Sequence, residues 1–150
     1  MTEVDLLQSL LAGEHAAVYG YGVLGARLDD ALRAAAQAAD DAHRARRDEL
    51  TALLRGRGAQ VPVTLAAYDV AVAGTPAALA LAVRLEEGLG VRWRDLVGGT
   101  DDAGLRRLGV AGLTATAVRA AQWRAALGVQ PPTVALPGTP RRSPRRGPFG

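Results

Sequence analysis

The sequence predicts an all-α protein built as a bundle of four helices of similar length. Apolar residues recur at heptad-like spacing over four long stretches, residues typical of helix N-caps precede these stretches, and prolines or glycines separate them. A chain of 150 residues, 49% of them hydrophobic, is one domain with a single core. Only 4% of the residues are aromatic. Alanine, leucine and valine must therefore fill the core, which favours closely spaced helices.

The first two helices are expected to form an antiparallel hairpin. The first begins near Thr2, with Asp5 at capping-box spacing, and runs to about residue 27. The second begins at the aspartate pair 29–30, whose carboxylates suit a helix N-terminus, and runs to about residue 56. Only a residue or two separates these helices, so they must be neighbours that run in opposite directions.

A long crossover is expected between the second and third helices. Residues 58–74 contain Pro62 and are too apolar for a free linker, so they should pack along the bundle. Thr75 as N-cap and Pro76 at the first helical position begin the third helix, which runs to about residue 97. The fourth helix begins at the aspartate pair 101–102 and runs to about residue 127. One long crossover in a four-helix bundle is the connectivity of ferritin-like folds.

Residues 1–128 thus form the predicted bundle, and 129–150 form a tail rich in proline and arginine that we expect to be disordered. The basic balance of the chain comes from this tail. Of the 18 basic residues, all of them arginine, four lie in the last ten positions: Arg141, Arg142, Arg145 and Arg146. Without these four, 14 arginines face 15 acidic residues. The bundle itself therefore carries no signature of nucleic-acid binding, and only weak phosphate contacts through the tail are expected.

Each predicted helix carries a polar residue near the middle of its apolar seam. These residues are Glu14, His43, Glu86 and Arg119, the last about one turn past its midpoint. Because midpoints lie at one level in an antiparallel bundle, we expect a buried charge layer, with Arg119 or Arg46 as the cation beside Glu14. A buried carboxylate needs such a partner to offset its desolvation.

The layer also resembles part of a carboxylate-bridged di-iron or di-manganese site. Such sites take a Glu from each of two helices and a Glu-x-x-His from each of the other two. Here Glu14 and Glu86 supply the single glutamates, and Asp40 with His43 forms an Asp-x-x-His version of the motif. The fourth helix offers Arg119 instead of a second pair, so a full two-metal site cannot be built in one chain.

Three segments resemble a known family. They are residues 13–22 (Gly-Glu-His-Ala-Ala-Val-Tyr-Gly-Tyr-Gly), 43–48 (His-Arg-Ala-Arg-Arg-Asp) and 85–87 (Leu-Glu-Glu). The chain, over about residues 3–128, is similar to the ferritin-like domains of unknown function that occur as small stand-alone proteins in high-GC bacteria. This resemblance implies a ferritin-like bundle and no particular activity.

Two classes of function stay open. The favoured one is a non-catalytic bundle without a cofactor, acting in interaction or regulation, with a homodimer as one form. The alternative is an oxidase-type enzyme that binds iron or manganese through Glu14, Asp40, His43 and Glu86. The N-terminus lacks the basic and apolar regions of a signal peptide, and no segment is long and apolar enough to span a bilayer, so we expect a cytoplasmic protein without a membrane partner.

Overall fold

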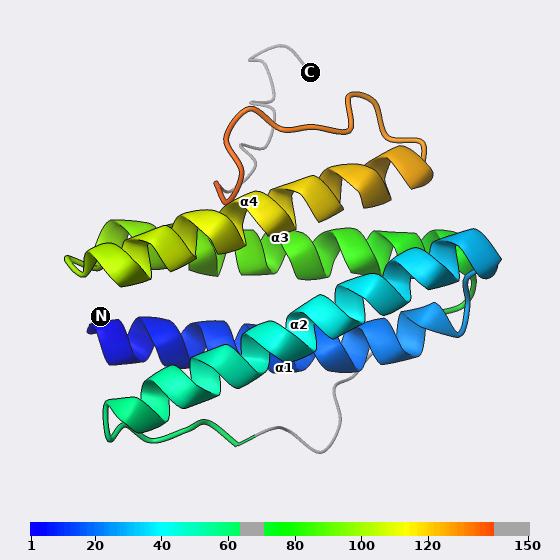
Figure 1. Ribbon diagram of the computed structural model, residues 1–150. Helices are drawn as coiled ribbons and strands as arrows, with labels where there is room; N and C mark the ends of the chain where they lie inside the picture. The colour runs from blue at the N-terminus through cyan, green and yellow to red at the C-terminus, as the bar shows by residue number, and fades with distance from the viewer. Residues whose placement is uncertain (64–70, 140–150) are drawn as a thin grey trace, which may run out of the picture.

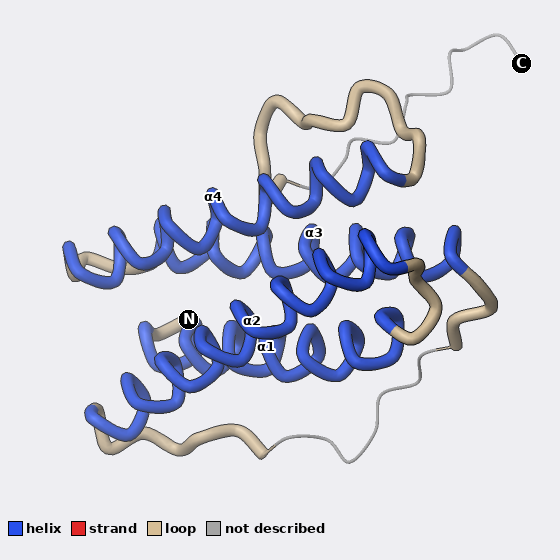
Figure 2. Tube along the Cα trace, turned by 45° about the vertical axis from the view of Figure 1, so that its right-hand side comes forward, coloured by secondary structure: helices blue, strands red, loops and turns tan. Residues whose placement is uncertain are grey.

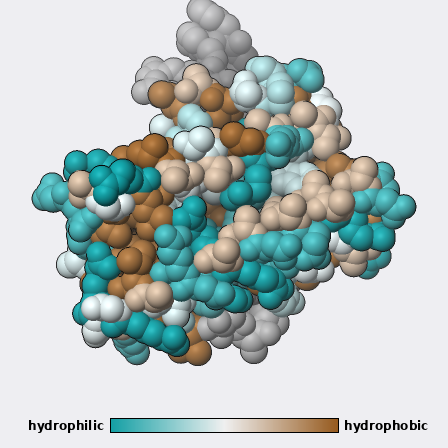
Figure 3. Space-filling model, viewed as in Figure 1, coloured by the Kyte–Doolittle hydropathy of each residue, from teal (hydrophilic) through white to brown (hydrophobic). Residues whose placement is uncertain are grey.

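A computed structural model describes residues 1–63 and 71–139 of the chain, and it confirms the all-α four-helix bundle (Figure 1). Helices are the only regular elements in this described part (Figure 2). They are α1 (Glu3–Gly25), α2 (Asp30–Gly56), α3 (Thr75–Gly99) and α4 (Ala103–Ala126). None of them is long and apolar enough to cross a bilayer. On the face shown in Figure 3, hydrophilic side chains gather along α2.

The helices pack as two hairpins, α1 with α2 and α3 with α4, joined through contacts between α1 and α3. At one end of the bundle the Thr75 hydroxyl donates to the carbonyl of Arg27, 2.9 Å away. At the other end the Thr100 hydroxyl donates to the carboxylate of Glu3. Helix α3 therefore begins where α1 ends and ends where α1 begins. Helices α1 and α4 run in one direction, and α2 and α3 run in the other.

The connection between α2 and α3 has to bridge the length of the bundle. Just after α2, the carbonyl of Gln60 accepts a hydrogen bond of 2.8 Å from the side-chain amide of Gln8, near the start of α1. Helix α3 begins at the opposite end. Of the expected crossover over residues 58–74, the described residues 58–63 follow α2 and the described residues 71–74 precede α3, and residues 64–70 are outside the described part.

Local capping residues define most of the helix starts, as the sequence predicts. The Thr2 hydroxyl accepts from the Asp5 backbone N–H at 3.2 Å, and the Asp5 carboxylate accepts from the Thr2 N–H at 2.7 Å, which completes the capping box. Asp29 and Asp102 cap α2 and α4 by accepting from backbone N–H groups three residues further on.

The predicted start of α3 is wrong by one residue. Gly74, not Thr75, occupies the N-cap position, and no side chain caps this helix. Thr75 is the first helical residue, followed by Pro76. Its hydroxyl is unavailable for capping because it bonds to Arg27, 48 positions earlier in the chain.

Small residues bring α3 and α4 close together, as the low aromatic content suggests. The indole of Trp93, which is 1% exposed, lies against Gly112 of α4. A Cβ atom at Gly112 would be 2.4 Å from this ring. A glycine is therefore required at this helix crossing if the tryptophan keeps its position.

The chain after α4 turns back over α3 and α4 (Figure 1). Its carbonyl at Pro132 accepts a hydrogen bond of 2.9 Å from the buried guanidinium of Arg124. Gly138 lies so close to α3 that a Cβ atom there would be 2.5 Å from the carbonyl oxygen of Gly90. Residues 129–139 thus differ from the disordered tail that we expected. They have no helix or strand, yet contacts with the bundle hold them. The four tail arginines lie outside the described residues.

Candidate functional site

The four helices bring Glu14, His43, Glu86 and Arg119 together in the middle of the bundle. Glu14, His43 and Glu86 are each 1% exposed. The side chain of Arg119 is 22% exposed and reaches the layer from the edge. Each helix contributes one of the four residues, and on α1, α2 and α3 this residue lies on the buried face of the helix.

The imidazole of His43 lies between two carboxylates. Its Nδ1 is 2.7 Å from Glu14 Oε2, and its Nε2 is 3.0 Å from Glu86 Oε1. Both ring nitrogens face acceptors, and this arrangement suits the doubly protonated ring. Burial acts to lower the pKa of His43, but the hydrogen bonds to Glu14 and Glu86 outweigh it and raise the pKa to about 9. His43 is therefore a buried cation at neutral pH.

One carboxylate oxygen, Glu86 Oε1, is the centre of the hydrogen-bond network. It accepts from the Tyr21 hydroxyl at 2.6 Å, from Arg119 Nε at 2.9 Å and from His43 Nε2 at 3.0 Å. Burial acts to raise the pKa of Glu86, but His43, Arg119 and Tyr21 outweigh it and hold this pKa below its usual value. The Tyr21 oxygen in turn accepts from Trp123 Nε1 at 2.8 Å. The network thus extends from α2 through α3 and α1 to α4.

Sequence reasoning missed the roles of Tyr21 and Trp123. Tyr21 lies on the apolar seam of α1, yet its ring stacks on His43 at 5.1 Å between centroids and its hydroxyl bonds to Glu86. The signal was the spacing, since Tyr21 lies one heptad after Glu14 and so on the same helix face. A buried tyrosine usually has a hydrogen-bond partner for its hydroxyl.

Arg46 does not bond to Glu14, although the sequence offered it as a partner. Its guanidinium donates to Glu49 at 2.6 Å and lies over the Trp93 ring, 5.2 Å from the centroid. Arg46 does line a cavity of about 40 Å³ beside Glu14 and Arg119. Its place is therefore at the border of the layer rather than within the hydrogen-bond network.

Asp40 is buried, 7% exposed, but faces a different partner from His43. Its Oδ2 accepts from Arg44 Nε at 2.8 Å, one turn further along α2. Its Oδ1 is buried and has no hydrogen-bond partner within the described part of the chain. Asp40 is therefore paired on its own helix instead of joining His43 as an Asp-x-x-His ligand pair.

The layer does not fit a two-metal centre. A metal site needs several lone pairs that converge on one point, but the His43 nitrogens point at two different carboxylates. On α4 the layer receives Arg119, and the nearby Thr116 hydroxyl is bonded to backbone carbonyls. Over residues 1–63 and 71–139, no group of three or more His, Cys, Asp or Glu side chains is arranged to hold a metal ion.

Comparison with known proteins places the chain in a family without an assigned activity. The pattern of a domain of unknown function, DUF4439, matches residues 6–141. The chain belongs to this family. The matched range includes the segment after α4, so that segment is part of the family domain.

A solved structure supports the same fold. The crystal structure of a conserved hypothetical protein from Mycobacterium tuberculosis is 32% identical, with a TM-score of 0.79. The similarity covers 83% of this chain and 96% of that one. No curated protein matches.

Proposed function

We propose that this protein is a ferritin-like bundle that acts through binding or regulation in the cytoplasm, without metal-dependent catalysis. In this proposal the charge layer takes the place of a carboxylate-bridged metal centre. The helix directions and the single long connection between α2 and α3 support the ferritin-like assignment. The observation that carries the proposal is the position of the His43 ring between Glu14 and Glu86.

The charges of the layer balance without a metal ion. Two carboxylates, Glu14 and Glu86, face two cations, His43 and Arg119. A divalent ion about 4 Å from the guanidinium would be repelled by about 8 kcal/mol at an effective dielectric constant of about 20. A repulsion of that size cancels the whole binding free energy of a site with a dissociation constant of about 1 μM.

Metal analysis of the protein prepared without an affinity tag tests this proposal. After incubation with Fe(II) or Mn(II) and dialysis, the wild type should retain at most one weakly bound ion per chain. Arg119→His removes the repelling charge and adds a ligand, so it should retain more metal. Arg107→His is the matched control, because it adds a histidine to α4 at an exposed position. Two tightly bound ions in the wild type would refute the proposal and favour the oxidase-type alternative.

A further inference from the structure

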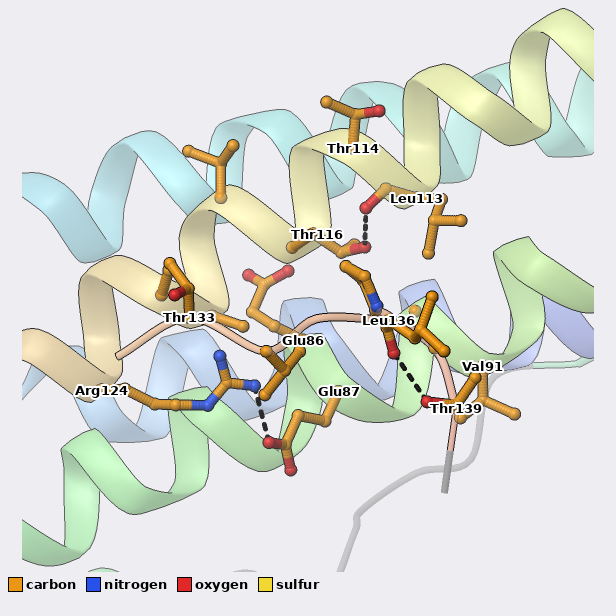
Figure 4. A pocket seen from close by; sticks show the side chains of 18 of the residues that line it. Glu86, Glu87, Val91, Leu113, Thr114, Thr116, Arg124, Thr133, Leu136 and Thr139 are labelled. Atoms are coloured by element: carbon orange, nitrogen blue, oxygen red, sulfur yellow. Dashed lines mark hydrogen bonds and ion pairs between the residues drawn. The ribbon is translucent and has the colours of Figure 1, made fainter. Parts of the chain in front are cut away.

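A large groove lies between α3, α4 and residues 133–139 (Figure 4). Its volume is about 1110 Å³, slightly above the usual range of roughly 300–1,000 Å³ for small-molecule pockets. Most of its lining is apolar and comes from all three segments, including Val91, Leu113, Ala117, Ala121, Val134 and Leu136. The groove can therefore take a molecule with a long or bulky apolar body.

The charged residues that line the groove leave little net charge for a ligand to meet. Arg124 is paired with Glu87 at 2.7 Å, as Figure 4 shows, and Glu86 is paired with Arg119 behind the lining. The charged lining residues are two cations, Arg84 and Arg124, and two anions, Glu86 and Glu87, so their charges sum to zero. A charged head group would therefore meet no net opposite charge to offset the loss of its hydration, and the lining favours an uncharged ligand.

Two buried polar atoms in the lining residues have no hydrogen-bond partner within the described part of the chain. They are Glu86 Oε2 and Arg124 Nε. Glu86 is 1% exposed and Arg124 is 3% exposed. All three bonds to the Glu86 carboxylate go to Oε1, so the lone pairs of Oε2 remain unused. Buried polar atoms without partners are rare, and in the lining of a pocket they mark where a ligand's polar group can bind.

We infer that this groove binds an uncharged, mainly apolar small molecule whose hydroxyl or amide group donates a hydrogen bond to Glu86 Oε2. The apolar body lies between α3 and α4 under residues 133–139. The donor group enters next to the charge layer, where the lining side chains shift to admit it. This inference needs no metal in the layer, so it stands or fails separately from the proposed function.

A set of decyl compounds with different head groups tests the inference. Each one competes with the neutral dye Nile red for the full-length protein near pH 7, with dye fluorescence as the readout. 1-Decanol should displace the dye, whereas decanoate and decylamine should be at least about tenfold weaker. Decyl methyl ether keeps the chain but lacks the donor. It should also be about tenfold or more weaker, because hydrogen bonds to charged acceptors contribute that much.

A pair of substitutions on α4 shows whether binding occurs in the groove. Ala121→Trp places a bulky side chain inside the groove and should weaken displacement by 1-decanol. Ala125→Trp, four residues on and exposed outside the groove, is the matched control and should bind 1-decanol like the wild type. Far-UV circular dichroism and urea denaturation establish that both variants fold. The ligand series is preferred to a Glu86 variant, since changing Glu86 would disturb the charge layer.

Several outcomes would overturn the inference. These are absence of saturable 1-decanol binding, equal binding by Ala121→Trp, and equal or tighter binding of decanoate, decylamine or the ether. Sedimentation velocity tests another occupant, a second copy of the chain. If the wild type is a dimer that binds no 1-decanol, and Ala121→Trp is a monomer, the groove would be assigned to the second copy.

Discussion

The buried positive charge on His43 makes the stability of the folded protein depend on pH within a defined window. The pKa of His43 is about 9 in the fold, against an ordinary value of 6.5. The interval of about 2.5 pH units, at about 1.4 kcal/mol per unit, corresponds to about 3–4 kcal/mol. Because the folded state holds the proton more tightly, this stabilisation is complete below pH 6.5. It is lost as the pH rises through 9.

Urea denaturation from about pH 6 to about pH 9.5, followed by far-UV circular dichroism, measures this loss. The free energy of unfolding of the wild type should fall by about 3 kcal/mol over that range, and that of His43→Gln should change little. A wild-type decrease no larger than that of His43→Gln would refute the assignment of the charge to His43. Absolute stability is not the readout, because the variant also loses hydrogen bonds.

Other titrating groups near the network act outside this window. Burial and Arg47 lower the pKa of His15. The titration of His15 therefore changes the stability of the fold at pH values below about 6.5, and there it makes the free energy of unfolding rise with pH. His15→Gln is therefore a control that should keep the loss at high pH. Burial and the Glu86 carboxylate raise the pKa of Tyr21 above its ordinary value of 10. The lowered pKa of Glu86 gives a contribution that is lost only in acid.

Two further predictions concern packing and pairing. Glu14→Ala removes the carboxylate from one side of the buried His43 cation. It should reduce the free energy of unfolding by about 3–5 kcal/mol at neutral pH. A urea midpoint near that of the wild type would exclude the buried pair. Gly112→Ala should reduce the free energy of unfolding by about 1–3 kcal/mol, because the new Cβ would clash with the Trp93 ring. Gly22→Ala is the contrasting change, since a Cβ there has nothing within 4 Å and the position is exposed. It should raise helix stability by up to about 1 kcal/mol, and equal effects of the two glycine variants in thermal denaturation would contradict the packing argument.

The bundle could be predicted from the sequence because its determinants are local. Seam spacing and the caps at Thr2, Asp29 and Asp102 each depend on residues within a few turns of one another. The segment 129–139 could not be predicted in this way. Its proline and glycine content is also that of a disordered chain, and its position depends on tertiary contacts such as that of Arg124 with the Pro132 carbonyl.

The members of the charge layer could be proposed from the sequence, but their pairing could not. Seam position places Glu14, His43, Glu86 and Arg119 at one depth, whatever the exact rotation of each helix. Which cation meets which carboxylate depends on that rotation. The sequence offered an arginine for Glu14, whereas the structure places His43 there and gives Arg119 to Glu86.

A large loss of stability in Glu14→Ala would not mean that the layer stabilises the bundle by that amount. Removing one partner of a buried pair measures mainly the penalty of leaving the other charge unpaired, and well-packed apolar residues often support a core equally well. Net stability is therefore a weak explanation for four charged residues here.

The arrangement of the charge layer has two chemical consequences instead. The cations His43 and Arg119 use the carboxylate lone pairs that a metal would need, and all three bonds to Glu86 meet at Oε1. Oε2 of the same carboxylate is left as a hydrogen-bond acceptor without a partner in the described residues, on a residue that lines the groove.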